Sequence, residues 1–208
     1  MARSKSSSRW LNRQNNDPYV ARAQSEGYRS RAVYKLQEIE RKYEIFATNQ
    51  IIVDLGAAPG AWCQYIIKNV ANSAGKVFAL DILDMAEIEG VQIIKGDFTE
   101  AEPLNQLVSL LNKQHVHLVL SDMAPNISGN KAVDQPKSMY LAELALDFAR
   151  EHLVQGGAFV VKLFQGQGYP EYLEELRSSF KRVSTFKPQA SRKESKEMYA
   201  IARDFSYS

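Results

Sequence analysis

The chain has 208 residues, of which 45% are hydrophobic and 24% charged, and its formal net charge is +2. These values are typical of one globular domain, and apolar runs of roughly six residues exclude a membrane span, so we expect a cytoplasmic protein. The basic first residues lead into no apolar signal stretch, and the lone Cys63 with three scattered histidines excludes an internal disulfide and argues against a bound metal.

From residue 50 onward, short β-branched runs alternate with helical patterns, which is typical of parallel strands joined by right-handed crossovers. Before this region, the apolar spacing predicts a helix over Ser30–Lys42. The apolar runs predict strands at Gln50–Leu55, Lys76–Asp81, Val91–Gly96, Val116–Ser121, Ala158–Phe164, Arg182–Phe186 and Met198–Ala202. Helices are expected at Ala61–Val70, Pro103–Lys113, Lys137–Leu153 and Pro170–Phe180, with Gly156 and Gly157 ending the third. We therefore expect an α/β fold in which a seven-stranded, mostly parallel sheet has helices on both faces.

A tight turn from Gly56 to Gly60 joins the first of these strands to the helix that follows. In doubly wound sheets, ligands bind beyond the carboxyl ends of the strands, and glycine lets the backbone come within contact distance of a ligand. Pro59 has no N–H to face a pyrophosphate, which disfavours a nicotinamide dinucleotide. The turn therefore predicts a site for a different ligand; a tight turn without a ligand is the alternative.

Two acidic residues follow consecutive strands next to this turn. Asp81 ends the second strand 21 residues after Gly60, where a carboxylate can accept both hydroxyls of an adenosine ribose. Asp97 follows the third strand, from which a carboxylate could accept the adenine amino group. Either acid alone is more often a cap at a strand end, but the two together favour an adenosine-containing cofactor. Trp62 either packs on this cofactor or fills the core.

Lys162 lies within an apolar strand, where an unpaired ammonium would be destabilising by several kcal/mol as a rough figure. Its expected partners are Asp122, at the end of the neighbouring strand, and Glu197, which opens the last strand. The alternative is a lysine on an edge strand with its head in solvent. Burial and a nearby Lys35 favour the neutral amine, whereas the two acids favour the ammonium, and the residues alone do not decide between them.

The net charge hides a segregation along the chain. Residues 1–35 carry eight Lys/Arg against two acids, and residues 181–203 carry seven against two, while residues 36–180 carry eleven against nineteen. If the two basic ends meet in space, they form a cationic face of the kind that binds a phosphate backbone. A solvated basic tail is the alternative, and the Ser6–Ser8 segment is expected to be mobile when unbound.

Taken together, these motifs resemble the RrmJ/FtsJ-type ribose 2′-O-methyltransferases, known as RlmE in bacteria. The resemblance spans nearly the whole chain and departs in small ways, such as Ala61 where relatives often have a second glycine. It is carried by Tyr28–Leu36, Asp54–Trp62, Ser121–Asn126, Val161–Gly166 and Arg192–Tyr199.

The resemblance implies a Rossmann-like class I methyltransferase that uses S-adenosylmethionine, with a basic, partly flexible arm over residues 1–27 and one methyltransferase domain over residues 28–208. It implies a catalytic tetrad in which Lys162 acts as base or aligns the ribose hydroxyl, Asp122 and Glu197 orient it, and Lys35 holds the substrate. It places the cofactor against Gly60, Trp62, Asp81, Asp97 and Asp122.

The arm looks like that of the bacterial ribosomal branch of the family, which methylates a uridine in the A loop of 23S rRNA in the large ribosomal subunit. Tyr28 and Tyr34 lie among the basic residues and either stack on a splayed base or fill the core. We expect a monomer, although the residues do not show the oligomeric state. A tRNA 2′-O-methyltransferase, a ribosome-assembly factor without catalysis and a nicotinamide oxidoreductase are the rival functions.

Overall fold

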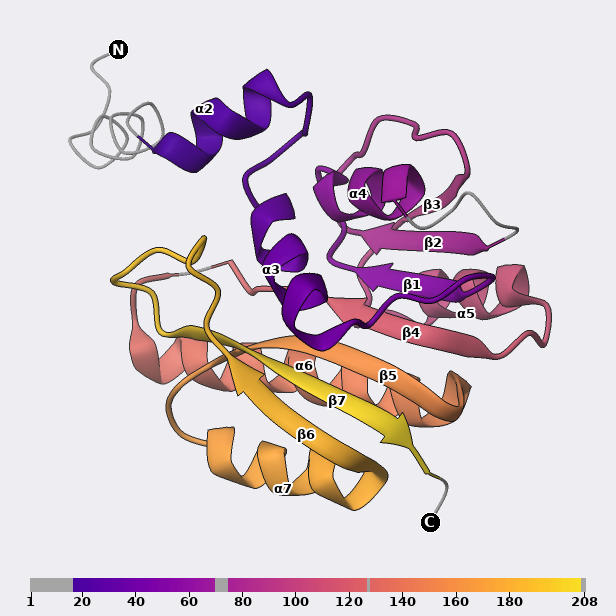
Figure 1. Ribbon diagram of the computed structural model, residues 1–208. Helices are drawn as coiled ribbons and strands as arrows, with labels where there is room; N and C mark the ends of the chain where they lie inside the picture. Colours follow the sequence, from indigo (N-terminus) through magenta and orange to yellow (C-terminus); the bar gives the residue numbers. More distant parts are fainter. Residues whose placement is uncertain (1–16, 70–74, 127, 207–208) are drawn as a thin grey trace.

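The computed structural model describes residues 17–69, 75–126 and 128–206. The expected mobility of Ser6–Ser8 and the expected helix residue Val70 lie outside these ranges. Within them the chain forms one seven-stranded sheet (Figure 1), built from β1 (Ile51–Leu55), β2 (Lys76–Asp81), β3 (Val91–Lys95), β4 (Val116–Ser121), β5 (Leu153–Phe164), β6 (Phe180–Phe186) and β7 (Glu197–Phe205).

The strand order is β3-β2-β1-β4-β5-β7-β6, and β7 runs antiparallel to both of its neighbours while the remaining pairs are parallel. The chain reverses its direction of winding between β1 and β4, which is the switch point where doubly wound sheets bind ligands. All seven predicted strands are present, so the predicted seven-stranded, mostly parallel sheet is confirmed. Because β7 is antiparallel, its first residue, Glu197, lies at the same edge as the last residues of β4 and β5.

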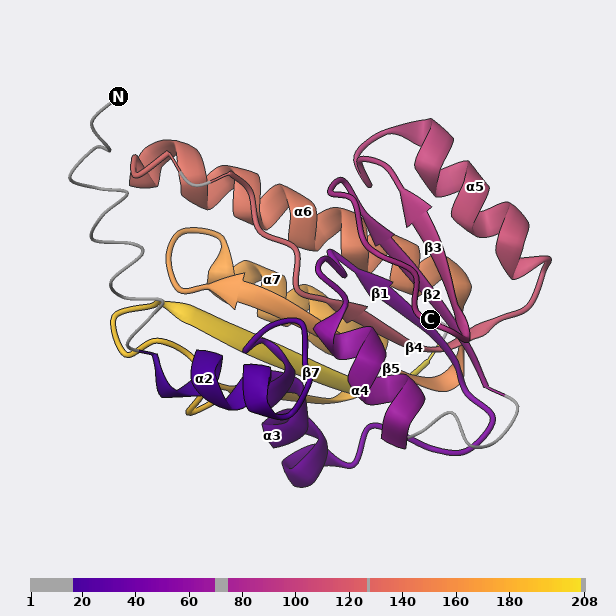
Figure 2. The ribbon, with the colours of Figure 1, turned by 90° about the horizontal axis from the view of Figure 1, so that it is seen from above.

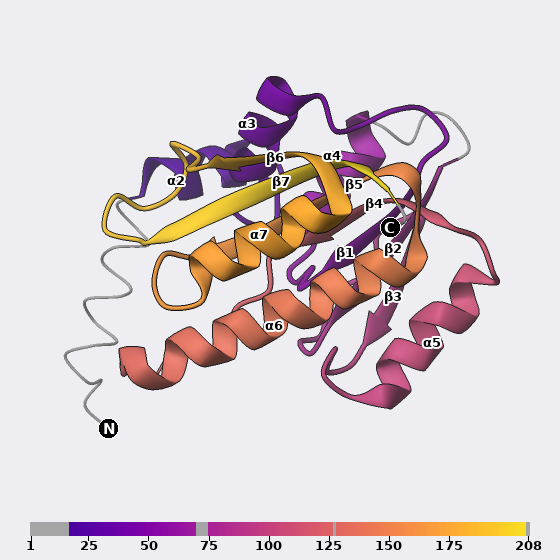
Figure 3. The ribbon, with the colours of Figure 1, turned by 90° about the horizontal axis from the view of Figure 1, so that it is seen from below.

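Helices cover both faces of the sheet, as Figures 2 and 3 show. One face packs against α5 (Ala101–Leu111), α6 (Lys131–His152) and α7 (Tyr169–Ser179), and the other against α3 (Val33–Tyr43) and α4 (Ala61–Asn69). The short α2 (Pro18–Ser25) packs outside α3. In the described part of the chain, no helix is both long and apolar enough to cross a membrane.

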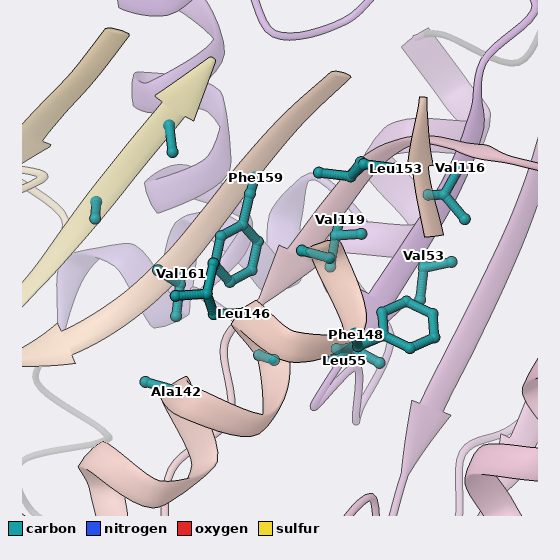
Figure 4. Packing of buried hydrophobic residues seen from close by; sticks show 14 of the residues in the cluster. Val53, Leu55, Val116, Val119, Ala142, Leu146, Phe148, Leu153, Phe159 and Val161 are labelled. Atoms are coloured by element: carbon teal, nitrogen blue, oxygen red, sulfur yellow. The ribbon is translucent and has the colours of Figure 1, made fainter. Parts of the chain in front are cut away.

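The alternation of side chains along each strand separates two cores. Val53 and Leu55 of β1 face α6, where Phe148 packs beside them (Figure 4), whereas Ile52 points to the α3 and α4 side. Strands covered on both faces need apolar residues at nearly every position, which explains the continuous apolar runs of the sequence.

Two expectations about local structure were incomplete. Helix α2 was not predicted; Asp17 caps it by accepting a hydrogen bond from Tyr19 N at 3.0 Å, and Pro18 begins it. Helix α6 begins at Lys131 and not at Lys137, because the Asn130 side chain caps its first turn. Pro136 is then accommodated inside the helix.

The predicted role of Gly156 and Gly157 was wrong, because the helix ends at His152 and both glycines lie within β5. The pairing of β4 with β5 passes from Val116↔Leu153 directly to Leu118↔Ala158, so β5 carries additional residues at this point. Gly156 adopts a φ of +80°, and a Cβ at Gly157 would lie 2.9 Å from the carbonyl oxygen of Val154. The glycine pair therefore makes an irregularity in the strand and does not end a helix.

Candidate active site

The turn after β1 requires glycine at two positions. Gly56 has a φ of +77°, and a Cβ there would lie 2.8 Å from Met123. Gly60 has a φ of +101°, and a Cβ there would lie 2.8 Å from both Met85 and Ile88. Only glycine adopts these angles without strain and leaves room for such close neighbours. The turn can therefore bring its backbone to the edge of the cavity described next.

A cavity of about 550 Å³ opens at the carboxyl ends of the first four strands, which is within the size range of small-molecule sites. Asp81, Asp97 and Asp122 all line it, so the structure brings these three predicted cofactor residues together. Gly60 and Trp62 are not among the described residues that line it. Its other walls come from the turn, from the Met123–Asn126 segment, and from Lys137 and Tyr140 on α6.

Backbone amides hold two of the acids at the rim of this cavity. Asp81 accepts hydrogen bonds from Ala58 N and Leu83 N, both at 2.8 Å. Asp97 accepts through Oδ1 from the backbone N–H and the hydroxyl of Thr99. Both acids therefore cap local turns, as their position at strand ends suggested, and the caps also orient the carboxylates toward the cavity.

Trp62 is 3% exposed and lies in the core between α4 and the start of α3. Its Nε1 donates a hydrogen bond to the carbonyl oxygen of Ala32 at 2.8 Å, and its ring centroid lies 6.0 Å from that of Tyr199. These contacts correspond to the second of the two roles considered for Trp62, in which its side chain fills the core.

The four residues of the predicted tetrad come from four elements and form two ion pairs. Lys162 Nζ lies 3.1 Å from Asp122 Oδ1 and also donates a hydrogen bond to the Asp122 carbonyl oxygen. Lys35 Nζ lies 2.7 Å from Glu197 Oε1. Sequence reasoning expected Lys162 to contact both acids, but the structure divides the acids between the two lysines. Strand β5 is an interior strand and the Lys162 side chain is 8% exposed, so the alternative of an edge lysine in solvent is wrong.

Tyr199 joins the two pairs and was missing from the predicted site. Its hydroxyl donates a hydrogen bond to Asp122 Oδ1 at 2.5 Å, and Lys35 Nζ lies 5.7 Å from the centroid of its ring. Tyr199 is opposite Lys162 in the β5–β7 register. The signal was available in the sequence, because residues two apart on a strand share a face and Tyr199 follows Glu197 by two.

The charges around Asp122 keep it ionised. Burial works to raise the pKa of this carboxyl, but the charges of Lys162 and Lys35 and the hydrogen bond from Tyr199 outweigh burial and bring the pKa below its ordinary value. The Tyr199 hydroxyl has a pKa well above its ordinary value, mainly because it is buried and also because Asp122 and Glu197 are close. The site therefore holds an ionised Asp122 beside a neutral phenol.

Asp54, at the penultimate position of β1, opens the segment at which the cofactor was expected, but no individual role was predicted for it. It is fully buried, and its Oδ2 accepts a hydrogen bond from Cys63 Sγ at 3.2 Å, while its Oδ1 has no partner among the described residues. Burial raises its pKa to about 7, and the nearby Asp122 and Asp81 act in the same direction. A hydrophilic residue inside the apolar run Ile51–Leu55 is the signal that could have identified it.

Comparison with solved structures shows which class of fold this is. A chain from Plasmodium falciparum, described as a ribosomal RNA methyltransferase, superposes with a TM-score of 0.78 at 31% identity and covers 86% of this chain and 98% of its own. A Streptococcus mutans methyltransferase solved in complex with SAH superposes with a TM-score of 0.52 at 13% identity over 84% of this chain and 96% of its own. The fold is that of an α/β methyltransferase.

The chain belongs to the FtsJ-like methyltransferase family, whose model matches residues 28–205. Among its relatives, the ribosomal RNA large subunit methyltransferase E of Francisella tularensis subsp. novicida is 51% identical over 205 residues, which are 99% of both chains. The protein of the same name from Stenotrophomonas maltophilia is 52% identical over 97% of this chain and 95% of its own. These comparisons confirm the predicted resemblance and the predicted enzyme class.

Proposed function

We propose that this methyltransferase uses S-adenosylmethionine to methylate the ribose 2′-OH of a uridine in the A loop of 23S rRNA in the large ribosomal subunit. The observation that carries this proposal is the pairing of Lys162 with Asp122 at the mouth of the cavity, with Lys35 and Glu197 beside them. The names of the relatives from Francisella and Stenotrophomonas supply the ribosomal RNA substrate.

The cavity fits an adenosine-containing cofactor. Asp81 and Asp97 stand at the ends of adjacent strands, where one suits the ribose hydroxyls and the other the adenine amino group, and Asp122 stands nearer the tetrad. When bound, S-adenosylmethionine supplies an activated methyl group on a positively charged sulfur. Gly60 shapes the turn at the cavity and Trp62 supports it from the core, so we assign both residues an indirect part in cofactor binding.

In this proposal the tetrad aligns the ribose hydroxyl and provides a group that can accept its proton. Lys162 is held by both the carboxylate and the carbonyl oxygen of Asp122, which fixes the position of its amine. From this position Lys162 takes the hydroxyl proton or orients the hydroxyl oxygen, and alignment of the attacking oxygen supplies much of the rate. Asp122 and Glu197 orient the two lysines, and Lys35 contacts the substrate from α3.

RNA reaches this site across the basic face of the protein. Arg31 connects the N-terminal segment with the 187–196 loop, because it pairs with Asp17 and donates a hydrogen bond to the carbonyl oxygen of Ala190. The described part of the N-terminal segment therefore meets the 187–196 loop, which supports a phosphate-binding face formed by the two basic ends. We propose that residues 1–27 act as an arm that holds RNA, residues 28–208 form the methyltransferase domain, and the protein acts as a cytoplasmic monomer.

The proposal is tested by supplying labelled cofactor with unmethylated large subunits, naked 23S rRNA and bulk tRNA. We expect label in 23S rRNA, and mass mapping should place it on a uridine of the A loop. Lys162→Ala should bind the cofactor normally and lose methyl transfer by about 100-fold or more. Lys76→Ala, at the opposite end of the sheet, is the matched control. Label confined to tRNA, or full activity of Lys162→Ala, would contradict the proposal.

A further inference from the structure

A second cavity, separate from the one at the strand ends, lies where three distant segments of the chain meet. It has a volume of about 260 Å³ and is walled by α2, by the outer side of α3 and by Gln189 of the 187–196 loop. Figure 2 shows α2 beside this loop and α3. The volume is below the range of about 300–1,000 Å³ for drug-sized ligands, which suits a single ring system better than a larger molecule.

The walls of this cavity are fixed by contacts between the segments. Glu38 accepts hydrogen bonds from Gln189 N at 2.6 Å and Ala190 N at 2.9 Å, so the loop is fastened to α3. Arg31 fastens both to the start of α2 through Asp17 and Ala190. The cavity is thus preformed, and a ligand need not order it.

The lining combines flat rings with free polar groups. The rings of Tyr19 and Tyr34 lie 5.5 Å apart between their centroids, and the Arg22 guanidinium lies 4.4 Å from the Tyr34 centroid. Tyr34 is 2% exposed and serves as the packed floor, whereas Tyr19 is only partly buried. The side-chain amides of Gln37 and Gln189 have no hydrogen-bond partner among the described residues. Together they offer two NH2 groups, with four N–H donors, and two carbonyl oxygen acceptors of the kind that read base edges.

The charged side chains of the lining determine which kind of ligand the cavity can hold. The Glu38 carboxylate contributes to the lining, so an anion placed inside the cavity would be repelled. The guanidinium of Arg22 lies over the Tyr34 ring and is paired with Glu26 at 2.7 Å. Arg41 is an exposed residue of the lining, and its guanidinium suits a phosphate that stays outside. A neutral, planar, hydrogen-bonding group inside with anions at the rim is the pattern of a nucleotide whose base is inserted.

We propose that this cavity holds one unstacked base of the substrate RNA, at a second contact outside the methyl-transfer site. This inference rests on the RNA substrate of the proposed function. Glu38 of the cavity and Lys35 of the tetrad are neighbours on α3 at a spacing of three residues. One RNA strand crossing α3 can therefore contact both sites, and the inserted base sets the register in which the ribose reaches Lys162.

The test fills the cavity without changing the charge of the protein. Gln37→Trp fills it from α3 and Gln189→Trp from the loop, and Gln24→Trp on the exposed part of α2 is the matched control. Binding of a 23S rRNA fragment that contains the A loop is measured, followed by methylation of that fragment and of large subunits. Because stacking on an aromatic ring contributes substantially per base, both cavity variants should bind the fragment about 5- to 100-fold more weakly and raise its KM accordingly. Gln24→Trp should match the wild type.

Other outcomes overturn the inference or separate it from the proposed function. Cavity variants that bind the naked fragment as the wild type does would refute it. A loss seen only with assembled subunits would assign the cavity to a ribosomal protein and would refute it too. A wild-type protein that binds RNA through the cavity yet methylates no 23S rRNA would contradict the proposed function and leave the cavity assignment standing.

Discussion

Asp122 Oδ1 accepts a hydrogen bond from the Tyr199 hydroxyl at 2.5 Å, and the same oxygen lies 3.1 Å from Lys162 Nζ. One carboxylate oxygen therefore pairs with Lys162, the lysine of the proposed reaction, and also accepts a hydrogen bond from the neutral Tyr199 hydroxyl. The Asp122 backbone N–H donates a hydrogen bond to the carbonyl oxygen of Leu55 at 3.0 Å, which connects Asp122 to the end of β1. The position of the Lys162 amine is thus determined by contacts to the rigid sheet.

Tyr199→Phe removes the phenol donor and keeps the ring against Trp62. Because the Tyr199 hydrogen bond helps to depress the pKa of Asp122, its loss raises that pKa. As the solution is acidified, the variant should therefore lose activity at a higher pH than the wild type does, because activity needs the ionised carboxylate. At neutral pH the kcat of the variant should be about tenfold lower than that of the wild type. A pH–rate profile measures both. Tyr172→Phe removes a buried phenol that donates to Ala142, away from the site, and should leave the profile unchanged.

Lys35 and Glu197 should stabilise the protein as a unit. Glu197→Gln alone leaves Lys35 largely buried without its counterion, whereas Lys35→Met together with Glu197→Gln removes both charges. A double-mutant cycle by urea unfolding should give a coupling energy of about 1–3 kcal/mol. The pair Arg177 and Glu174 on the surface of α7 is the control, and it should give less than about 1 kcal/mol. Equal coupling in the two cycles would show that burial adds nothing.

Asp54→Asn should change how stability depends on pH. Burial raises the folded pKa of Asp54 to about 7, while an unfolded aspartate titrates at about 3.9. Between these values the folded protein keeps a proton that the unfolded chain has lost, so the stability due to this group falls as the pH rises from about 4 to about 7. The free energy of unfolding of the wild type should drop by about 4 kcal/mol more than that of the variant across this window.

Urea unfolding at a series of pH values measures this difference. Asp84→Asn, whose side chain is 85% exposed, is the control and should follow the wild type. Parallel curves for the wild type and Asp54→Asn would show that Asp54 does not take up a proton on folding.

Gly56→Ala should impair both folding and cofactor binding. Gly27 has a φ of +75°, close to the +77° of Gly56, but a Cβ at Gly27 would meet nothing within 4 Å. Gly27→Ala should therefore show the cost of the backbone angle alone, about 1–2 kcal/mol. Gly56→Ala should cost more, because its Cβ displaces Met123, which lines the cavity at the strand ends. Thermal unfolding and calorimetric titration with S-adenosylmethionine compare the two variants. Equal losses of stability and of cofactor affinity in both would show that the contact with Met123 does not matter.

The sequence by itself determined the sheet and the shared position of the three acids that we propose for cofactor binding. Runs of apolar residues identify strands that are covered on both faces, and the carboxyl ends of parallel strands meet at one edge. Asp81, Asp97 and Asp122 follow three such strands, so their proximity required no knowledge of packing. Lys162 could be assigned a partner because a buried ammonium needs one.

Only the tertiary structure decided which acid pairs with which lysine. The antiparallel β7 places Glu197 opposite Phe164 and Tyr199 opposite Lys162, and α3 then brings Lys35 to Glu197. Local residue patterns do not encode this register, because it depends on how a helix and two strands distant in the sequence pack together. The same holds for the second cavity, whose walls come from α2, α3 and the loop at Gln189, which are brought together by tertiary packing.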